Sequence, residues 1–539
     1  MTAQPLRAAD LLAQRLYEAG CRHAFGMPGG EVLTLVDALE KAGIAFHLAK
    51  HENAAGFMAE GVHHVDGAPA ILVATVGPGA MNGVNVVANA LQDRVPLMVL
   101  TGCVDADEAL SYTHQVLDHA AVFAPITKGS FRLTPGGADT IADKAVSLAM
   151  APRQGPVHID VPISVAGAPV AEGARRRLAP SSAVAPAGAD LAKARDWLAG
   201  ARRPVAILGL DILRDGSAPV VQAFLEHFQI PFVTTYKAKG VVDEDHALCL
   251  GGAGLSPLAD RHLVPFIQSA DLILCIGYDP IEMRTGWREI WDPATQNVID
   301  IAAVANDHYM HQAGLNIIGD TGASLEALAQ GLRGVQTWPG DEVVAVKKAL
   351  AGAFPLDDIW GPAAVIAEAR AVMPAGTLAT ADSGAHRILL SQMWACEAPK
   401  SLVQSSGLCT MGCAVPLAIG LKLAAPDRPV ISFSGDAGFL MVAGELATAR
   451  ELGVPVIFVV FVDASLALIE LKQRQRQMTN RGVDFDRHDF AAMGRAFGGQ
   501  GVTVRTREEL RAALEAARGS ETFTVIAAEI ERGAYDGRI

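Results

Sequence analysis

Short runs of apolar residues, many of them ending at Gly, Pro or Asp, alternate along the chain with segments whose apolar positions repeat every three to four residues. The runs predict β-strands that are buried on both faces, and the segments between them predict amphipathic helices. The first helix is expected at 8–19 and leads to a strand at 23–26. This alternation predicts an α/β fold made of doubly wound parallel sheets.

The predicted strands fall into three groups, which we interpret as three sheet domains of similar size. They are expected at 23–26, 70–75, 97–101 and 157–161, then at 205–208, 231–234, 272–276 and 297–301, and finally at 377–380, 429–434, 456–461 and 524–529. An Ala/Pro/Ser/Arg-rich stretch at 170–191 has no periodicity and is typical of a linker. The predicted domains are therefore 1–170, 190–335 and 355–539. Gly-rich turns after buried strands in the first and third favour a distant duplication.

Composition agrees with several globular domains. The 539 residues exceed the roughly 250–300 at which a single core stops growing. The net charge of −14 and the lack of Lys/Arg runs argue against nucleic acid as a partner. Seven scattered cysteines predict neither disulfides nor zinc and favour a reducing cytoplasm. The longest apolar run, 454–462, is shorter than the ~20 residues of a membrane helix, so we expect no membrane association.

The sharpest local feature is the turn Gly435-Asp436-Ala437-Gly438, which follows the strand predicted at 429–434. A helix expected at 440–452 would direct backbone N–H groups and its positive end toward the carboxyl edge of the sheet. Open α/β sheets bind ligands at this edge, so it suits a phosphate group. Considered alone, such a turn also occurs as a plain helix start with an Asp near the N-terminus.

A second acid follows the next predicted strand. Asp463 lies 27 positions after Asp436 (463 − 436), and Ser465 follows it. Because adjacent parallel strands bring their ends together, we predict that Asp436, Asp463 and the loop at Ser465 bind Mg²⁺ or another divalent cation through oxygen ligands.

This arrangement resembles the motif of thiamine-diphosphate-dependent enzymes, in which Gly-Asp-Gly is followed after a fairly constant interval by a strand end that carries Asn. Here Ala437 replaces the second glycine and keeps its N–H, while Asp463 replaces the commoner Asn and remains an oxygen ligand. The resemblance implies that Gly435, Ala437 and Gly438 contact thiamine diphosphate.

Three motifs near the N-terminus resemble the pyrimidine-binding domain of the acetolactate synthase family: Phe-Gly-Met-Pro-Gly-Gly at 25–30, His-Glu-Asn-Ala-Ala at 51–55 and Gly-Pro-Gly-Ala-Met-Asn at 77–82. The resemblance implies that Glu52 hydrogen-bonds the pyrimidine ring of the cofactor and activates it. Considered alone, Glu52 is also consistent with an exposed glutamate at a helix start. The cofactor contacts implied here are Pro28, Gly29, Gly30, Gly79 and Asn82.

Two further segments, Asp-Ser-Gly-Ala-His at 382–386 and Gly-Leu-Cys-Thr-Met-Gly at 407–412, resemble the loops of the same family over the diphosphate and between the cofactor rings. They imply cofactor contacts from Gly384, His386 and Cys409, which replaces a glycine. Met411 would bend the cofactor so that its reacting groups approach each other, although a Met in an apolar loop more often fills core space. Cys409 and Cys413 have the wrong spacing for a redox pair and are expected to be small buried side chains.

The residues that choose the substrate are less clear. Gln115 falls where acetolactate synthases carry an active-site Gln, and His114 replaces a phenylalanine. His114 is a candidate proton shuttle, although a loop histidine is more often only solvated or hydrogen-bonded. Ile163 stands where the family often has Lys, and Lys472 stands near the position at which biosynthetic acetolactate synthases commonly have a Trp that shapes the acceptor pocket. A cation at that place predicts an acidic or phosphorylated acceptor.

The resemblance implies decarboxylation of a pyruvate-like 2-oxo acid with thiamine diphosphate, followed by carboligation to an acceptor. The alternatives are a lyase or decarboxylase that acts on a 2-hydroxyketone or an acyl-CoA, and a homologue that binds the cofactor without turnover. Gly-Tyr-Asp-Pro-Ile-Glu at 277–282 is similar to members that do not use flavin, so FAD is not expected. Because the sites of this family form between subunits, a homodimer or homotetramer is expected.

Overall fold

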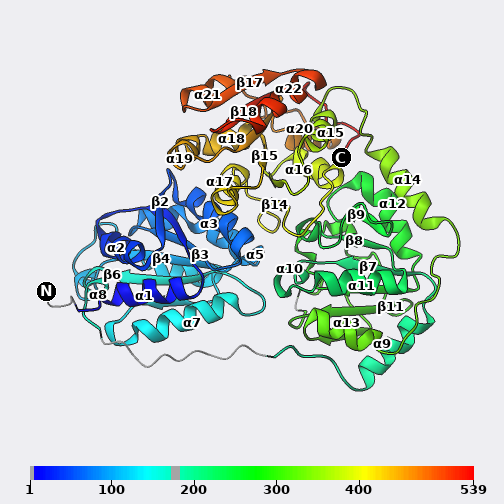
Figure 1. The fold of residues 1–539 in the computed structure, drawn as a ribbon, viewed down its shortest axis with the longest axis horizontal. Coiled ribbons are helices and arrows are strands. Elements are labelled where there is room, and N and C mark those ends of the chain that lie inside the picture. Colours follow the sequence, from blue (N-terminus) through cyan, green and yellow to red (C-terminus); the bar gives the residue numbers. More distant parts are fainter. Residues whose placement is uncertain (1–4, 171–181, 307) are drawn as a thin grey trace.

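The computed structural model describes residues 5–170, 182–306 and 308–539. They form three six-stranded sheets in which neighbouring strands run parallel, with helices packed on both faces (Figure 1). The predicted fold class, α/β with three doubly wound parallel sheets, is confirmed. In Figure 1 the N-terminal domain (blue to cyan) and the central domain (green) lie side by side, and the C-terminal domain (yellow to red) packs against both.

The N-terminal sheet has the strand order β2-β1-β3-β4-β6-β5. Its strands are β1 (His23–Met27), β2 (Ala45–Leu48), β3 (Ala70–Ala74), β4 (Leu97–Cys103), β5 (Ser130–Arg132) and β6 (Val157–Pro162). Its helices are α1 (Ala8–Glu18), α2 (Leu33–Ala42), α3 (Glu52–Asp66), α4 (Pro78–Asn82), α5 (Val84–Gln92), α6 (His119–Phe123), α7 (Ala138–Met150) and α8 (Ile163–Ala166).

The C-terminal sheet repeats this topology with the order β14-β13-β15-β16-β18-β17. Its strands are β13 (Leu378–Ala381), β14 (Leu402–Gln404), β15 (Val430–Gly435), β16 (Ile457–Val462), β17 (Gln500–Val504) and β18 (Thr524–Glu529). Its helices are α15 (Pro362–Val372), α16 (Ala385–Met393), α17 (Ala414–Ala424), α18 (Asp436–Val442), α19 (Glu445–Glu451), α20 (Ala467–Gln475), α21 (Phe490–Ala496) and α22 (Arg507–Arg518). The shared order supports the hypothesis of a duplication.

The central sheet differs, because its order β12-β11-β10-β7-β8-β9 is that of the dinucleotide-binding doubly wound fold. Its strands are β7 (Pro204–Leu208), β8 (Phe232–Thr234), β9 (Cys249–Gly252), β10 (Leu272–Ile276), β11 (Asn297–Ala302) and β12 (Leu315–Ile318). Its helices are α9 (Ala189–Gly200), α10 (Ile212–Asp215), α11 (Ala218–Phe228), α12 (Pro257–Gln268) and α13 (Thr321–Ala329), and α14 (Glu342–Ala353) connects it to the C-terminal domain.

The single helix predicted at 440–452 is wrong, because the chain forms α18 and α19 with Gly444 between them, and glycine weakens a helix interior. Since α18 begins at Asp436, its N-terminus still lies at the sheet edge. Most of the predicted linker, 171–181, lies outside the described residues, and 182–188 contains neither helix nor strand.

The N-terminal and C-terminal domains share one apolar core, in which α3 packs against α17. The helices approach closely at two glycines. A Cβ on Gly61 would lie 2.4 Å from the carbonyl oxygen of Leu417, and one on Gly420 would lie 2.0 Å from that of Met58. Among the described helices, none is both long and apolar enough to cross a membrane.

Candidate functional site

Three carboxylates gather at the carboxyl edge of the C-terminal sheet because each follows one of three adjacent strands. Asp382 follows β13, Asp436 follows β15 and Asp463 follows β16. Strands β14 and β15 flank β13 on opposite sides, so the edge between β13 and β15 is the switch point at which open sheets bind ligands. All three acids are buried, with 0%, 2% and 4% of their surfaces exposed.

Asp436 and Asp463 are held together by the backbone. Asp436 Oδ2 accepts hydrogen bonds from the N–H groups of Asp463 (3.2 Å) and Ala464 (2.7 Å), and Oδ1 accepts one from Ala437 (2.8 Å). Burial and the charge of Asp436 raise the pKa of Asp463 to about 7, and burial raises the pKa of Asp436 as well. A divalent cation with oxygen ligands would stabilise this pair, because Mg²⁺ favours carboxylates.

Two buried side-chain atoms fit a bound diphosphate and cation. Among the described residues, Ser465 Oγ and His386 Nε2 have no hydrogen-bond partner. A buried polar atom without a partner costs about 1–3 kcal/mol, so two at one site point to a ligand. Burial lowers the pKa of His386 to about 3, so its ring is neutral and can donate one hydrogen bond.

Both atoms belong to residues that line a cavity of about 220 Å³ at this edge. The cavity brings together all ten C-terminal residues that the sequence predicted: Gly384, His386, Cys409, Met411, Gly435, Asp436, Ala437, Gly438, Asp463 and Ser465. We call these residues the C-terminal half-site.

Asp382 was not predicted as a site residue, although it begins the motif at 382–386. The Asp382 carboxylate accepts hydrogen bonds from the N–H groups of Gly412 (2.8 Å) and Cys413 (3.2 Å), so it anchors the loop that carries Met411. A Cβ on Gly438 would lie 2.0 Å from Asp382 Oδ2, which explains why this turn requires a glycine. Burial raises the pKa of Asp382 to about 6 against these hydrogen bonds.

The expectation that both cysteines of this loop are buried is wrong for Cys409 and correct for Cys413. Cys409 adopts a left-handed backbone conformation with φ of 54°, which turns it toward the cavity. Its Sγ donates to the carbonyl oxygen of Ser406 (3.1 Å) and accepts from the Arg387 guanidinium (3.3 Å). A glycine adopts this conformation at less cost than any other residue.

Glu52 is the first residue of α3 and is only 3% exposed, so the alternative of an exposed glutamate is wrong. Asn82 Nδ2 donates to Glu52 Oε2 at 2.9 Å. A Cβ on Gly79 would lie 3.0 Å from Glu52 Oε1 and 2.7 Å from Thr75 Cγ2, so the turn fits closely around the carboxylate. The N-terminus of a helix also favours a negative charge.

The other predicted cofactor contacts of the N-terminal domain follow strands at the same edge. Pro28, Gly29 and Gly30 follow β1, and Gly79 lies in the short helix α4 that follows the adjacent strand β3. A Cβ on Gly29 would lie 2.2 Å from Thr75 Oγ1, so the two turns pack against each other.

Gln115 lies over the turn after β3. It has φ of 60°, and its carbonyl oxygen would lie 2.6 Å from a Cβ on Gly77. His114 is exposed beside it, with its ring 6.2 Å from that of Tyr112. Glu52, Gln115, His114, Pro28, Gly29, Gly30, Gly79 and Asn82 are called the N-terminal half-site.

A buried cluster that sequence reasoning missed supports the turn at Gly77. His119 Nε2 accepts from the Gly77 N–H (3.2 Å), and His119 Nδ1 lies 2.9 Å from Asp160 Oδ1. His119, His158 and Asp160 are of metal-binding types, but their ligand atoms already pair with one another, with Thr101 or with Gly77. Burial alone would raise the pKa of Asp160, but hydrogen bonds from both histidines lower it. We interpret the cluster as a hydrogen-bond network that holds the turn at Gly77 in place.

The two half-sites do not meet within one chain. Every residue that lines the cavity lies between Ser383 and Tyr535, whereas Glu52 belongs to the N-terminal domain. Glu52 is therefore not among the described residues that line this cavity.

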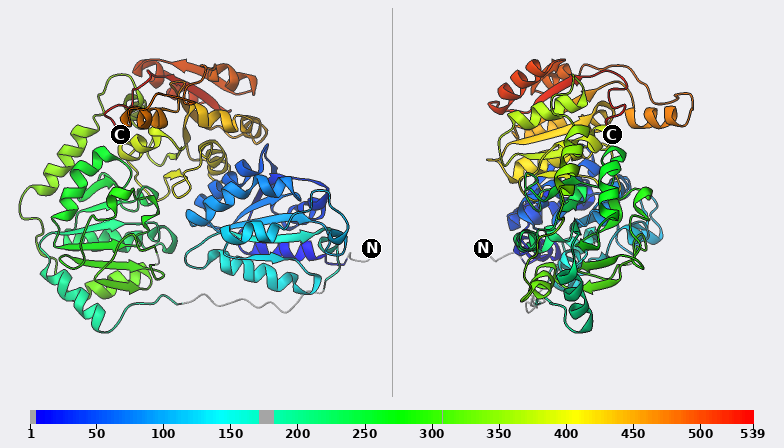
Figure 2. Two further views of the ribbon diagram at one scale, coloured as in Figure 1. Left: turned by 180° about the vertical axis from the view of Figure 1, so that it is seen from behind. Right: turned by 90° about the vertical axis from the view of Figure 1, so that its right-hand side faces the viewer.

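The interpretation of Lys472 as a residue of the acceptor pocket is not supported within this chain. Lys472 is exposed on α20, whereas Leu468 and Ile469 of the same helix line the cavity. No residue of α20 is buried, and this orange helix projects from the body of the C-terminal domain (Figure 2, right). Ile163 is partly exposed at the start of α8.

Comparisons with known proteins match all three domains. Residues 6–122, 191–328 and 382–528 match the N-terminal TPP binding domain, the central domain and the C-terminal TPP binding domain of thiamine pyrophosphate enzymes. The chain is 30% identical to an acetolactate synthase of Bacillus subtilis over 96% of its own length and 92% of the relative. It is 32% identical to a probable 2-ketoarginine decarboxylase of Pseudomonas aeruginosa over 97% and 93%. It is also 32% identical to the acetolactate synthase large subunit of Lactococcus lactis, over 92% and 88%.

Proposed function

Because the chain belongs to the thiamine pyrophosphate enzyme family, we propose that it decarboxylates a 2-oxo acid and joins the remaining fragment to an acceptor, as an acetolactate synthase does. The observation that carries the proposal is the C-terminal half-site, in which two buried acids, Ser465 Oγ and His386 Nε2 converge on one cavity.

The C-terminal half-site would bind the diphosphate through a cation. Asp436, Asp463 and Ser465 supply oxygen ligands for Mg²⁺, and the N-terminus of α18 offers backbone N–H groups to phosphate oxygens. His386 lines the same cavity beside these groups. Met411, half-buried beside the cavity, would fix the angle between the two rings of the cofactor.

The N-terminal half-site would activate the cofactor. When bound, thiamine diphosphate stabilises the electron pair that decarboxylation releases. Glu52 would share a proton with the pyrimidine ring, and Asn82 holds the Glu52 carboxylate in place for this hydrogen bond. Gln115 and His114 lie at the exposed end of this half-site, where they can contact the substrate.

We further propose that the chain works as a homodimer or homotetramer in which the N-terminal half-site of one subunit completes the C-terminal half-site of another. Pairing is needed because each chain keeps Glu52 away from the walls of its own cavity. The seven free cysteines, six of them buried, support a reducing cytoplasm as its location.

The test is to mix the protein with Mg²⁺, thiamine diphosphate and pyruvate, and to measure CO₂ and the products. Glu52→Gln should lower turnover by about 10²–10⁴-fold without loss of cofactor binding. Glu521→Gln, at an exposed position, is the matched control and should leave turnover unchanged.

The products separate the remaining alternatives. A joined product supports carboligation, and release of the aldehyde alone supports a simple decarboxylase. The second donor to try is 2-ketoarginine, because one relative is named for it. Trials with 2-hydroxyketones and acyl-CoA esters would identify a lyase, and cofactor binding without turnover of any of these would contradict the proposed activity.

A further inference from the structure

The loop that carries Met411 is held at one end by a domain other than its own. It runs from Ser405, after β14, to Cys413, before α17, and its left-handed residues include Cys409 and Gly412. A loop of this kind needs partners for its backbone N–H groups. Asp382 supplies them only at the end near α17.

At the other end the partner is Asp93 of the N-terminal domain. Asp93 Oδ1 accepts from the Gly407 N–H at 2.7 Å, and Asp93 Oδ2 accepts from the Ser406 N–H at 3.1 Å. A neighbouring contact extends the attachment, because Ser405 Oγ donates to Asn89 Oδ1 at 2.6 Å and accepts from the Thr410 N–H at 2.8 Å.

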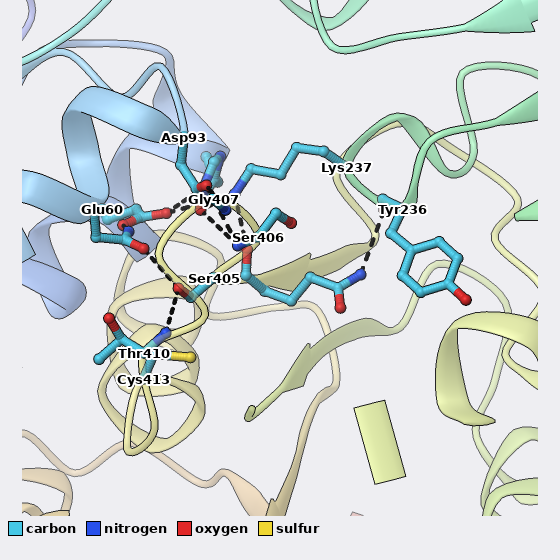
Figure 3. Close-up of polar contacts among 12 residues, drawn as sticks. Glu60, Asp93, Tyr236, Lys237, Ser405, Ser406, Gly407, Thr410 and Cys413 are labelled. Carbon is cyan, nitrogen blue, oxygen red and sulfur yellow. Dashed lines mark hydrogen bonds and ion pairs between the residues drawn. The ribbon is translucent and has the colours of Figure 1, made fainter. Parts of the chain in front are cut away.

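Asp93 can serve in this way only if its charge is compensated. Its side chain is completely buried, and a buried carboxylate without a partner costs several kcal/mol. The compensating cation is Lys237, which comes from the central domain and is itself buried. Lys237 Nζ donates to Asp93 Oδ2 at 2.8 Å and to the carbonyl oxygen of Gln404 at 2.8 Å. Figure 3 shows the three domains converging on this ammonium.

A second acid nearby does not compete for the ammonium. Glu60 Oε1 lies 3.9 Å from Lys237 Nζ, and Asn89 Nδ2 donates to Glu60 Oε2. Burial raises the pKa of Glu60 in spite of Lys237. The ammonium lies closest to Asp93, which is therefore its main partner.

We propose that Lys237 is a positioning residue for the cofactor, which acts through Asp93 and Gln404 to fix the loop at 405–413 and, with it, Met411. The central domain thereby sets the geometry of a site to which none of its described residues contributes a cavity wall. The inference rests on the proposed cofactor site, and the experiment separates the two.

The test compares two buried lysines of the central domain. Lys237→Met removes the cation of the loop, and Lys239→Met is the matched control. Lys239 is equally buried and pairs with Glu244 at 2.7 Å, and Glu244 accepts from the Cys396 N–H of the C-terminal domain, outside the loop. Affinity for thiamine diphosphate with Mg²⁺ is measured by calorimetric titration, hydrogen exchange is measured at 405–413, and the free energy of unfolding is measured in parallel.

We expect Lys237→Met to weaken cofactor binding by roughly tenfold or more and to speed exchange in the loop. Lys239→Met should lower stability without a selective effect on either quantity. The double variant Lys237→Met/Asp93→Asn is neutral at this site and keeps an oxygen acceptor, so it should fold and recover a large part of the lost affinity.

Equal effects of the two lysine substitutions would reduce Lys237 to a structural contact between domains and overturn the proposal. An unchanged affinity in Lys237→Met, or a double variant no better than the single one, would also do so. If the unmodified protein binds no thiamine diphosphate, the proposed function fails, whereas hydrogen exchange still decides whether Lys237 orders the loop.

Discussion

The N-terminal and C-terminal sheets have the same strand order, yet the residues at their carboxyl edges differ in kind. After the third strand of each sheet, the N-terminal domain has the turn Gly77–Gly79, and the C-terminal domain has Asp436–Gly438. The single acid of the N-terminal half-site already receives a hydrogen bond from Asn82. The C-terminal half-site retains two acids with raised pKa values and two polar atoms without partners. The topology places a loop, and the residues of the loop decide whether it needs a ligand.

Among substitutions that test this difference between the half-sites, Asp436→Asn should have the largest effect. Removal of one of the two carboxylate charges should weaken binding of Mg²⁺ with thiamine diphosphate by roughly 100-fold. Asn82→Ala in the N-terminal half-site should leave that affinity almost unchanged and lower turnover instead. Calorimetric titration and steady-state rates measure the two effects, and a similar loss of affinity in both variants would remove the distinction between the half-sites.

The second prediction concerns pH. Asp463, with a pKa of about 7, must lose its proton before a cation binds, so affinity should rise with pH. We expect binding roughly tenfold weaker at pH 6 than at pH 8. In the cofactor-free protein, the raised pKa of Asp463 stabilises the folded state most when the pH lies below the ordinary pKa of a carboxyl group. This contribution to stability is lost as the pH rises through about 7. Asp463→Asn is the control, and a pH dependence that persists in it would assign the effect to another group.

The smallest effect is expected from substitutions of the glycines at the two equivalent positions, Gly438 and Gly79. Gly438→Ala places a Cβ 2.0 Å from the buried carboxylate of Asp382 and should lower the free energy of unfolding by about 1–3 kcal/mol. Gly79→Ala meets a methyl group of Thr75 at 2.7 Å, which can shift more easily, so it should cost less. Ala437→Gly, which adds no atom, is the control. Thermal unfolding measures all three, and a greater loss in Gly79→Ala would reverse the ranking.

The sequence predicted the interior of each sheet and missed its edges. All twelve predicted strands are present within a residue or two, because interior strands are buried on both faces and appear as continuous apolar runs. The six strands that were not predicted, β2, β5, β9, β12, β14 and β17, are the two edge strands of each sheet. They are short or partly exposed, as β5 and β17 illustrate, and they lack such runs.

The same division applies to the sites. Residues within local motifs, such as Asp436 and Glu52, could be proposed as site residues from spacing and resemblance. Lys237 could not, because its role depends on Asp93 and Gln404, more than 140 residues away in either direction. His119, at the start of α6, was missed for the same reason, since its partner Asp160 lies on β6, 41 residues further along the chain.

The close crossing of α3 and α17 has a consequence for how the protein responds to heat. Since Gly61 and Gly420 bring the two backbones into contact and one apolar core continues through both domains, neither domain can lose its structure without exposing the core of the other. The N-terminal and C-terminal domains should therefore melt as one calorimetric unit, with a single transition whose van't Hoff enthalpy reflects both.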